Sequence, residues 1–303
     1  MSRPWRVWRN TAYLLLVAAV IALVMYWWPT LAGIWREQAL TFVGAIAIMT
    51  CATLVQANNF LVFLDTPTRL RIWRFIPVWA WGALANYVAP LQSGSIAVRV
   101  AWLSRHKVSV TDSLLATWRQ LALSLWIALV GLAAGLLIMD DPRGRWPALV
   151  LFLLWLAMFF MRKLWLKWLS NITHPTWLAS RKQLMTKALS GITPSGVVGV
   201  IVQYVLGTLL LYWIYACFDA SIGLGQALVL ACLVYASSLI AVLPGNLGVT
   251  EAIYMLGGHG FGLDLAEAGA LALLIRTANI TTNLLIALVG VWLGGKGFGV
   301  ENE

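Results

Sequence analysis

Four charged side chains, Arg99, Arg119, Glu251 and Arg276, lie within or beside long apolar stretches of the sequence. A charge at the centre of a membrane helix costs about 2.5–3.5 kcal/mol on insertion scales, so such residues usually mark a binding site. Three of the four are arginines, whose planar guanidinium can bind two phosphate oxygens at once. If all four face one cavity, it is net positive and suits a phosphate, with Glu251 balancing one arginine. The alternative is that each charge only ties helices together or reaches the membrane surface.

The composition sets the class of protein in which these charges lie. The chain has 303 residues, of which 61% are hydrophobic and 11% are charged, whereas a soluble domain has about 25% charged residues. No soluble fold has enough interior to bury so much apolar surface, which excludes a soluble enzyme, a DNA-binding protein and a secreted module. The net charge of +10 is explained by basic loops on the inner side of a membrane rather than by nucleic acid.

Apolar runs of about 20 residues predict membrane-spanning helices. We expect these helices near residues 11–28, 38–61, 113–138, 195–217, 226–243 and 266–295, with a shorter one at 147–161. Two further apolar stretches, 75–103 and 244–262, are interrupted by prolines and glycines. Non-helical backbone at membrane depth persists only inside protein or beside a wet cavity, so we expect both to be broken or re-entrant. The predicted fold is an all-α integral membrane protein, a single polytopic domain (1–303) with about seven or eight transmembrane helices.

Basic residues predict the orientation of the chain. Arg3, Arg6 and Arg9 precede the first expected span, and the segment 162–190 interleaves basic residues with tryptophans. By the positive-inside rule, we expect a cytoplasmic N-terminus in a multi-pass protein of the cytoplasmic (inner) membrane. We expect 162–190 to be an amphipathic segment on the inner leaflet, either as an anchor or as a site for anionic head groups. Seven spans place the C-terminus outside, and eight place it inside.

The two interrupted stretches suggest an internal repeat. Pro90 precedes Arg119 by 29 residues, and Pro244 precedes Arg276 by 32. Paired interrupted segments in corresponding positions point to the substrate site of a transporter. Low local identity between the halves leaves two unrelated breaks as the alternative.

The segment Leu243-Pro244-Gly245-Asn246-Leu247-Gly248-Val249-Thr250-Glu251 is the most informative one in the chain. Pro244 is expected to end the preceding helix, and Gly245 and Gly248 permit positive φ and close approach of the backbone. Thr250 and Glu251 can then open a short helix. Its N-terminal amides would bind an anion, or Glu251 would cap the helix instead.

This segment resembles the Pro-Gly-Gly-x-Gly-x-x-Glu signature of the flippase-like family named for the transmembrane region of lysyl-phosphatidylglycerol synthases. Asn86-Tyr87-Val88-Ala89-Pro90, with Gly94 and Arg99, resembles the family's earlier Asn…Pro…Gly…Arg element. Arg119 and Arg276 fall where the family carries arginines after each element. The resemblance covers roughly residues 10–295. It departs at Asn246, which replaces a glycine, and at Thr250, where arginine is common.

The resemblance implies a bacterial inner-membrane protein that translocates a lipid or supports the assembly of lipid-linked glycans. The ligand would be an anionic phospholipid or a polyprenyl-phosphate-linked glycolipid. We expect no aminoacyl transfer, because the 303 residues hold no sequence for the soluble transferase domain of the fused synthases. The substrate-binding residues that it implies are Asn86, Gly94, Arg99, Arg119, Pro244, Gly245, Gly248, Glu251 and Arg276.

Three functional hypotheses follow. The first is a lipid translocator, driven downhill or by an ion, because the sequence has no P-loop. The second is a membrane glycosyltransferase using a polyprenyl-phosphate sugar, whose catalytic carboxylates would be Asp140, Asp141 or Asp219 in short outer loops. The third is a non-catalytic partner of a glycosyltransferase or lipid synthase. We favour the first and expect neither enzymatic activity nor a cofactor nor a metal.

Overall fold

The computed structural model describes residues 38–65, 70–89, 92–139, 146–153, 155–156, 191–239 and 244–293. Within these ranges all regular secondary structure is helical, which confirms the all-α fold. The expected first span (11–28) and the basic segment (162–190) lie outside the described residues. The expected span 147–161 is described only in part. Its residues up to 153 are helical, whereas 157–161 lie outside the described residues.

Four long apolar helices have the length and composition to cross a membrane. They are α2 (Ala39–Val62), α5 (Val110–Ile138), α8 (Pro194–Cys217) and α11 (Leu265–Leu293). Their ends agree with the ranges expected from the sequence to within three residues. The shorter helix α9 (Leu224–Leu239) also matches an expected span at its start. The total of seven or eight spans stays a prediction.

Each of the two interrupted stretches contains a break between short helices. The first consists of α3 (Ile72–Ala85) and α4 (Ser93–Arg105). In the second, the single 3-10 turn η1 (Pro244–Asn246) leads from α9 into α10 (Val249–Gly260). The chain therefore folds back at the two places where proline and glycine interrupt the apolar pattern.

Side chains at the helix starts fix where the long helices begin. Ser109 accepts a hydrogen bond from the backbone N–H of Asp112 (3.0 Å) at the start of α5. Thr193 does the same for Gly196 (3.2 Å) at α8, and Pro194 occupies the first helical position, where a missing N–H costs nothing. Such caps satisfy amides that a helix cannot pair internally.

The two halves of the described chain repeat the same series of elements. Helices α2 and α8 both have 24 residues, and α5 and α11 both have 29. Between them lie pairs of short helices, α3 and α4 (14 and 13 residues) in the first half and α9 and α10 (16 and 12 residues) in the second. Two short sequences also occur in both halves. Val-Gly-x-Ile starts at Val43 and Val198, and Ile-Ala-Leu-Val-Gly starts at Ile127 and Ile286. The interrupted segments thus belong to an internal repeat.

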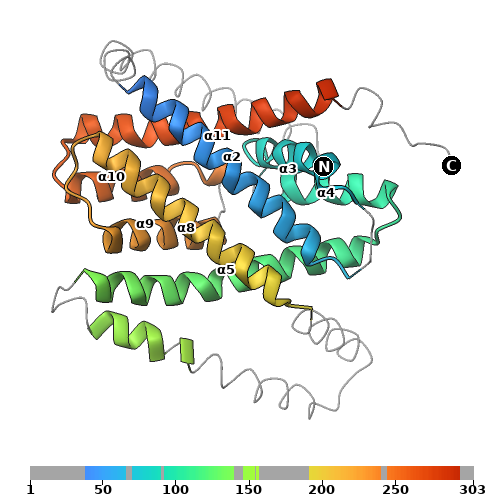
Figure 1. The fold of residues 1–303 in the computed structure, drawn as a ribbon, viewed down its shortest axis with the longest axis horizontal. Coiled ribbons are helices and arrows are strands. Elements are labelled where there is room, and N and C mark those ends of the chain that lie inside the picture. Colours follow the sequence, from blue (N-terminus) through green and yellow to red (C-terminus); the bar gives the residue numbers. More distant parts are fainter. Residues whose placement is uncertain are drawn as a thin grey trace, which may run out of the picture.

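The two repeats run in opposite directions. The side-chain amide of Gln38, at the start of α2, donates to the carbonyl of Cys217, at the end of α8 (2.9 Å). Gly44 and Gly199 hold the same position in the two helices, and each packs against a side chain of the opposite helix. In Figure 1, α11 (orange to red) crosses the upper part and α5 (green) the lower part of the molecule, and the two run in opposite directions. An inverted repeat of this kind is common among transporters.

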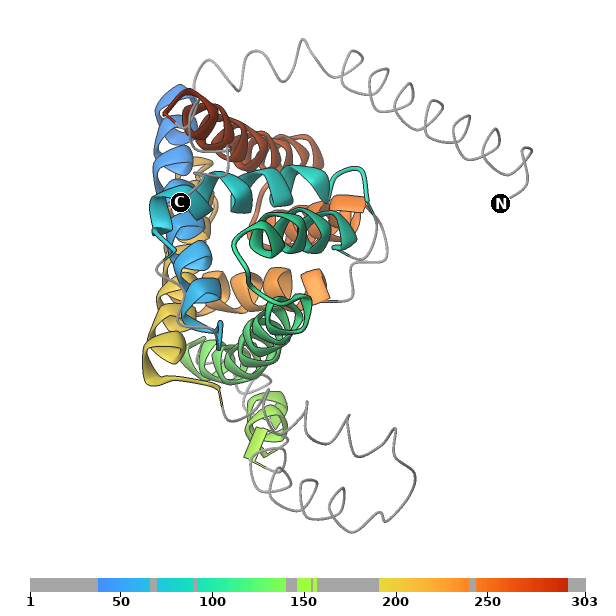
Figure 2. The same ribbon diagram turned by 90° about the vertical axis from the view of Figure 1, so that its right-hand side faces the viewer.

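The short helices exchange partners between the halves. α3 packs against α11, and α9 packs against α5. Correspondingly, Gly290 of α11 lies against Pro77 of α3, while Gly131 of α5 lies against Cys232 of α9. Figure 2 shows α2 and α8 along one side of the bundle, with the short helices held between α11 and α5. Both breaks are thereby brought together between α11 and α5, on the side away from α2 and α8.

Candidate functional site

The first break is held by the end of α3. The side-chain oxygen of Asn86 accepts the backbone N–H of Ser95 (2.8 Å) in the first turn of α4. A Cβ on Gly94 would meet the backbone carbonyl carbon and oxygen of Ala85 at 2.5 Å, so only glycine lets the two helix ends approach this closely. The sequence predicts that Asn86 and Gly94 bind substrate. The role that these contacts show is to hold the end of α3 against the start of α4.

The second break depends on positive backbone angles. Gly245 has φ 61° and Gly248 has φ 85°, as the sequence predicts for these two glycines. Pro244 opens η1. The carboxylate of Glu251 accepts the backbone N–H of Gly248 (2.8 Å), so Glu251 caps α10 from its third position, in agreement with the capping interpretation.

The two breaks touch each other. The backbone N–H of Gly245 donates to the backbone carbonyl of Asn86 (2.6 Å). The carbonyl of Gly245 in turn accepts from Nη2 of Arg276 (2.9 Å), whose guanidinium lies 4.8 Å from the ring centre of Tyr87. This seam joins the turn of one repeat to the turn of the other and to α11.

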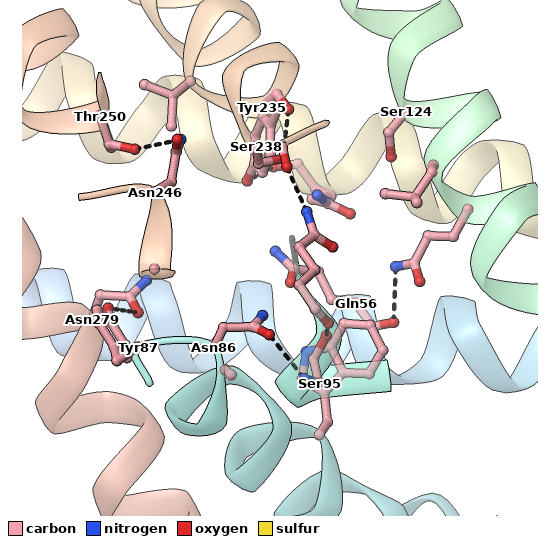
Figure 3. Close-up of a pocket in the computed structure, with 18 of the residues that line it drawn as sticks. Gln56, Asn86, Tyr87, Ser95, Ser124, Tyr235, Ser238, Asn246, Thr250 and Asn279 are labelled. Atoms are coloured by element: carbon pink, nitrogen blue, oxygen red, sulfur yellow. Dashed lines mark hydrogen bonds between the residues drawn. The ribbon is translucent and has the colours of Figure 1, made fainter. Parts of the chain in front are cut away.

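A cavity of about 330 Å³ opens beside this seam. Figure 3 shows Asn86 and Ser95 of the first break facing Ser238 and Asn246 of the second across it. Two charged residues line it, Arg99 and Arg276. Seven carboxamide side chains of the described residues also line it: Gln56, Asn86, Gln92, Gln120, Gln203, Asn246 and Asn279.

Arg99 is a buried cation at the cavity wall. Its side chain is 5% exposed, and its Nε and Nη2 donate to the carbonyl and hydroxyl of Ser95, both at 3.0 Å. The guanidinium lies over the rings of Phe60 (4.9 Å) and Trp79 (4.6 Å). No carboxylate of the described residues pairs with it. A buried charge without a counter-charge is costly, so this position is well suited to an anionic ligand.

Arg276 and Glu251 form the second charged element. Nε of Arg276 lies 2.9 Å from Oε1 of Glu251, and both side chains are partly buried. The pair is neutral as a whole, so the cavity retains the single positive charge of Arg99. Three of the four sequence-predicted charges are therefore gathered here, with Glu251 reaching the site through Arg276.

Arg119 lies elsewhere, which differs from the expectation of one shared cavity. Its guanidinium holds both carboxylate oxygens of Asp65 (2.6 and 3.0 Å) and the carbonyl of Phe63 (2.6 Å). The shared Ile-Ala-Leu-Val-Gly sequence aligns Arg276 with Thr117, which lines the cavity. Arg119 is two residues further on, a rotation of about 200° around the helix. Its equivalent in α11 is the fully buried Ala278. Arg119 thus faces the end of α2.

The carboxamides are the part of the site that charge-based reasoning missed. Gln56, Gln120, Gln203 and Asn279 each interrupt a long apolar helix, α2, α5, α8 and α11 respectively. An amide inside a membrane span is unfavourable unless it is paired or faces a polar space. Counting such amides along the expected spans would have indicated one polar face on every long helix.

A second cavity of about 200 Å³ adjoins the first. The two share lining residues that include Gln56, Tyr235, Tyr254 and Asn279. From there the second cavity extends between α2 and α8, along Met49 and Leu210, and is mainly apolar. The polar chamber at the breaks therefore continues into a space at the packing interface of the two repeats.

Of the three aspartates of the glycosyltransferase hypothesis, only Asp219 lies among the described residues. Asp140 and Asp141 lie outside the described residues. Asp219 follows α8 with φ 56° and does not line either cavity. Where the structure describes the chain, no group of three or more His, Cys, Asp or Glu side chains is placed to hold a metal ion.

The long apolar helices and the polar cavity between two inverted halves define a multi-pass α-helical membrane protein with an interior site. The chain belongs to the lysylphosphatidylglycerol synthase TM region family, whose model matches residues 5–290. No curated protein and no solved structure matches the chain. The family is named for enzymes of a membrane lipid, which connects this membrane domain with lipids.

Proposed function

We propose that the protein translocates a lipid by taking its phosphate-bearing head group into the cavity between the two breaks. The observation that carries this proposal is Arg99, buried and facing the cavity without a carboxylate partner in the described chain. A phosphate would supply the missing negative charge and accept from the free edge of the guanidinium. The ligand is an anionic phospholipid or a polyprenyl-phosphate-linked glycolipid.

Arg276 and Glu251 provide a second, exchangeable contact. Guanidinium groups bind carboxylates and phosphates with the same geometry, so an arriving phosphate competes with Glu251 for Arg276. When the phosphate leaves, the ion pair can form again. The pair thus allows a head group to bind without being trapped, which transport requires.

The inverted repeat offers a route for the movement. In transporters built this way, one repeat moves against the other around a central site. Here the halves meet at the hydrogen bond between Gly245 and Asn86, directly beside the cavity. The head group would cross through the polar space while the acyl or prenyl chains stay among the lipids. We infer a transport protein rather than an enzyme, in a bacterial inner membrane with the N-terminus in the cytoplasm.

Reconstitution tests the proposal. Purified protein in vesicles should move fluorescent phosphatidylglycerol between leaflets, measured as the fraction of label accessible to dithionite. Arg99→Met should slow this flux at least tenfold, about 1.4 kcal/mol of lost interaction. Arg105→Met is the matched control, because Arg105 lies exposed at the end of the same helix. Equal rates for Arg99→Met and wild type would refute the assigned site.

Flux of no lipid tested, neither phosphatidylglycerol nor a polyprenyl-phosphate sugar, would refute translocation. Co-purification with a glycosyltransferase or lipid synthase would then support the role of a non-catalytic partner.

A further inference from the structure

Four amide oxygens at the cavity have no hydrogen-bond donor among the described residues. Gln92 and Gln120 donate through their amide nitrogens to carbonyls of the protein, and Asn246 donates to two hydroxyl groups. Their oxygens accept nothing from the described residues. Oε1 of Gln203, a residue only 5% exposed, is likewise buried without a partner. Four acceptors from four parts of the chain thus line one space.

A phosphate alone cannot satisfy these groups. An ionised phosphodiester accepts hydrogen bonds and donates none, so it matches the arginines but not the amide oxygens. Of the four oxygens, Oε1 of Gln203 is the one shut off from water, and a buried acceptor left without a donor carries a desolvation penalty. A ligand with O–H or N–H groups next to its phosphate would pair these oxygens and relieve that penalty.

Charge decides between these two kinds of donor. Arg99 gives the cavity one net positive charge, and Glu251 is already engaged by Arg276 and by the N–H of Gly248. No other carboxylate of the described chain lines the cavity. Once a phosphodiester is bound, the charges of Arg99, Arg276, Glu251 and the phosphate sum to zero. An ammonium group would therefore add an uncompensated positive charge, whereas hydroxyl groups bring no charge.

Hydroxyl groups also fit the remaining donors. Asn86 and Asn279 have their oxygens engaged by Ser95, Tyr87 and Asn283, which leaves their amide nitrogens to donate. A hydroxyl both donates and accepts, so a polyol can use the free oxygens of one set of amides and the free nitrogens of the other.

We propose that the site selects a phosphodiester whose head group is a neutral polyol, such as glycerol, inositol or a sugar, and rejects a cationic aminoacyl head group. This inference rests on the proposed function for its lipid, and it names the chemistry of the head group that the same site takes. Arg99 and Arg276 hold the phosphate, and the amide oxygens of Gln120, Gln203 and Asn246 accept from the hydroxyls.

Equilibrium binding to the detergent-solubilised protein tests the selectivity. Labelled phosphatidylglycerol is compared with phosphatidylpropanol, which has the same charge and nearly the same size but no free hydroxyl, and with lysyl-phosphatidylglycerol. We expect phosphatidylglycerol to bind at least tenfold more tightly than either. Phosphatidylinositol and a polyprenyl-phosphate hexose distinguish a phospholipid source of the polyol from an isoprenoid one. Equal affinity for phosphatidylpropanol, or tightest binding of the lysyl lipid, would overturn the proposal.

Variants of Gln203 sharpen the test. Gln203→Leu should remove most of the preference for phosphatidylglycerol over phosphatidylpropanol. Gln203→Glu adds a carboxylate of the same shape and should shift the preference toward lysyl-phosphatidylglycerol. Thr208→Val is the control, since Thr208 lies one turn further along α8, bonds to the carbonyl of Tyr204 and does not line the cavity. Unchanged preferences in both Gln203 variants would count against the assignment.

The flux assay separates this inference from the proposed function. If the polyol preference holds in binding but no lipid moves, translocation fails and the ligand class stands. If lipids move at equal rates whatever their head group and bind with equal affinity, the ligand class fails and translocation stands.

Discussion

Asn246 and Thr250 are hydrogen-bonded to each other, with Nδ2 of the asparagine 2.9 Å from the threonine hydroxyl. These are the two positions at which the second break departs from the family signature. Asn246 also donates to the hydroxyl of Ser237 (2.9 Å) and adopts φ 55°, a left-handed conformation that asparagine tolerates better than most residues. The two departures are therefore in direct contact, and their hydrogen bond ties the turn to the start of α10.

The pair predicts an order of stability at position 246. Asn246→Ala loses both hydrogen bonds and keeps the strained backbone angle, so we expect a loss of about 3 kcal/mol, roughly 1 per hydrogen bond and 1 for the backbone. Asn246→Gly loses the bonds but relieves the strain, and should cost about 2 kcal/mol or less. Thermal unfolding in detergent measures both. An alanine variant as stable as the glycine variant would contradict this account of the turn.

Glu251 combines a cap with an ion pair, and a glutamine at this position separates the two. Glu251→Gln keeps an oxygen for the N–H of Gly248 but frees Arg276 and raises the charge of the cavity. We therefore expect tighter binding of phosphatidylglycerol, by about tenfold, together with slower flux, because the ion pair no longer competes with the bound phosphate. Binding and flux are measured on the same preparation.

Glu267→Gln supplies the control for this prediction. Glu267 caps α11 in the same manner, by accepting the N–H of Asp264 (3.0 Å), and lies away from the cavity. It should change neither binding nor flux. If Glu251→Gln weakens binding, or if both variants behave alike, the competition between Glu251 and phosphate is wrong.

The ion pair of Arg119 and Asp65 should stabilise the fold without affecting lipid selectivity. Asp65→Ala removes the carboxylate that binds a guanidinium only 2% exposed, and we expect a loss of about 3 kcal/mol. Arg119→Met should cost less, because the side chain of Asp65 is 40% exposed and can be hydrated. Unfolding temperatures measure the order. If the Arg119→Met variant is stable but has lost its preference for anionic lipids, Arg119 takes part in lipid binding and its assignment to a structural role is wrong.

These residues also show how far the sequence leads. The ends of the long helices follow from apolar length to within three residues, and the left-handed angles of Gly245 and Gly248 follow from residue type. The cap at Ser109, which starts α5 three residues before the expected 113, is not part of that prediction. The direction of Arg119 does not, because a displacement of two residues turns a side chain to the other side of a helix. The contact of Asn86 with Gly245 joins residues far apart in the chain, and only the packing of the two repeats determines it.

Close packing between the repeats predicts a further pair of outcomes. A Cβ on Gly290 of α11 would collide with the ring of Pro77 in α3, and the rigid ring cannot move aside. Gly290→Ala should therefore destabilise the protein by about 1–3 kcal/mol. At Gly260, near the end of α10, a Cβ would meet nothing within 4 Å, so Gly260→Ala should be neutral or slightly stabilising. Unfolding temperatures in detergent compare the two. Equal effects would mean that α3 and α11 do not meet at this glycine, and the inverted pairing of the short helices would lose its support.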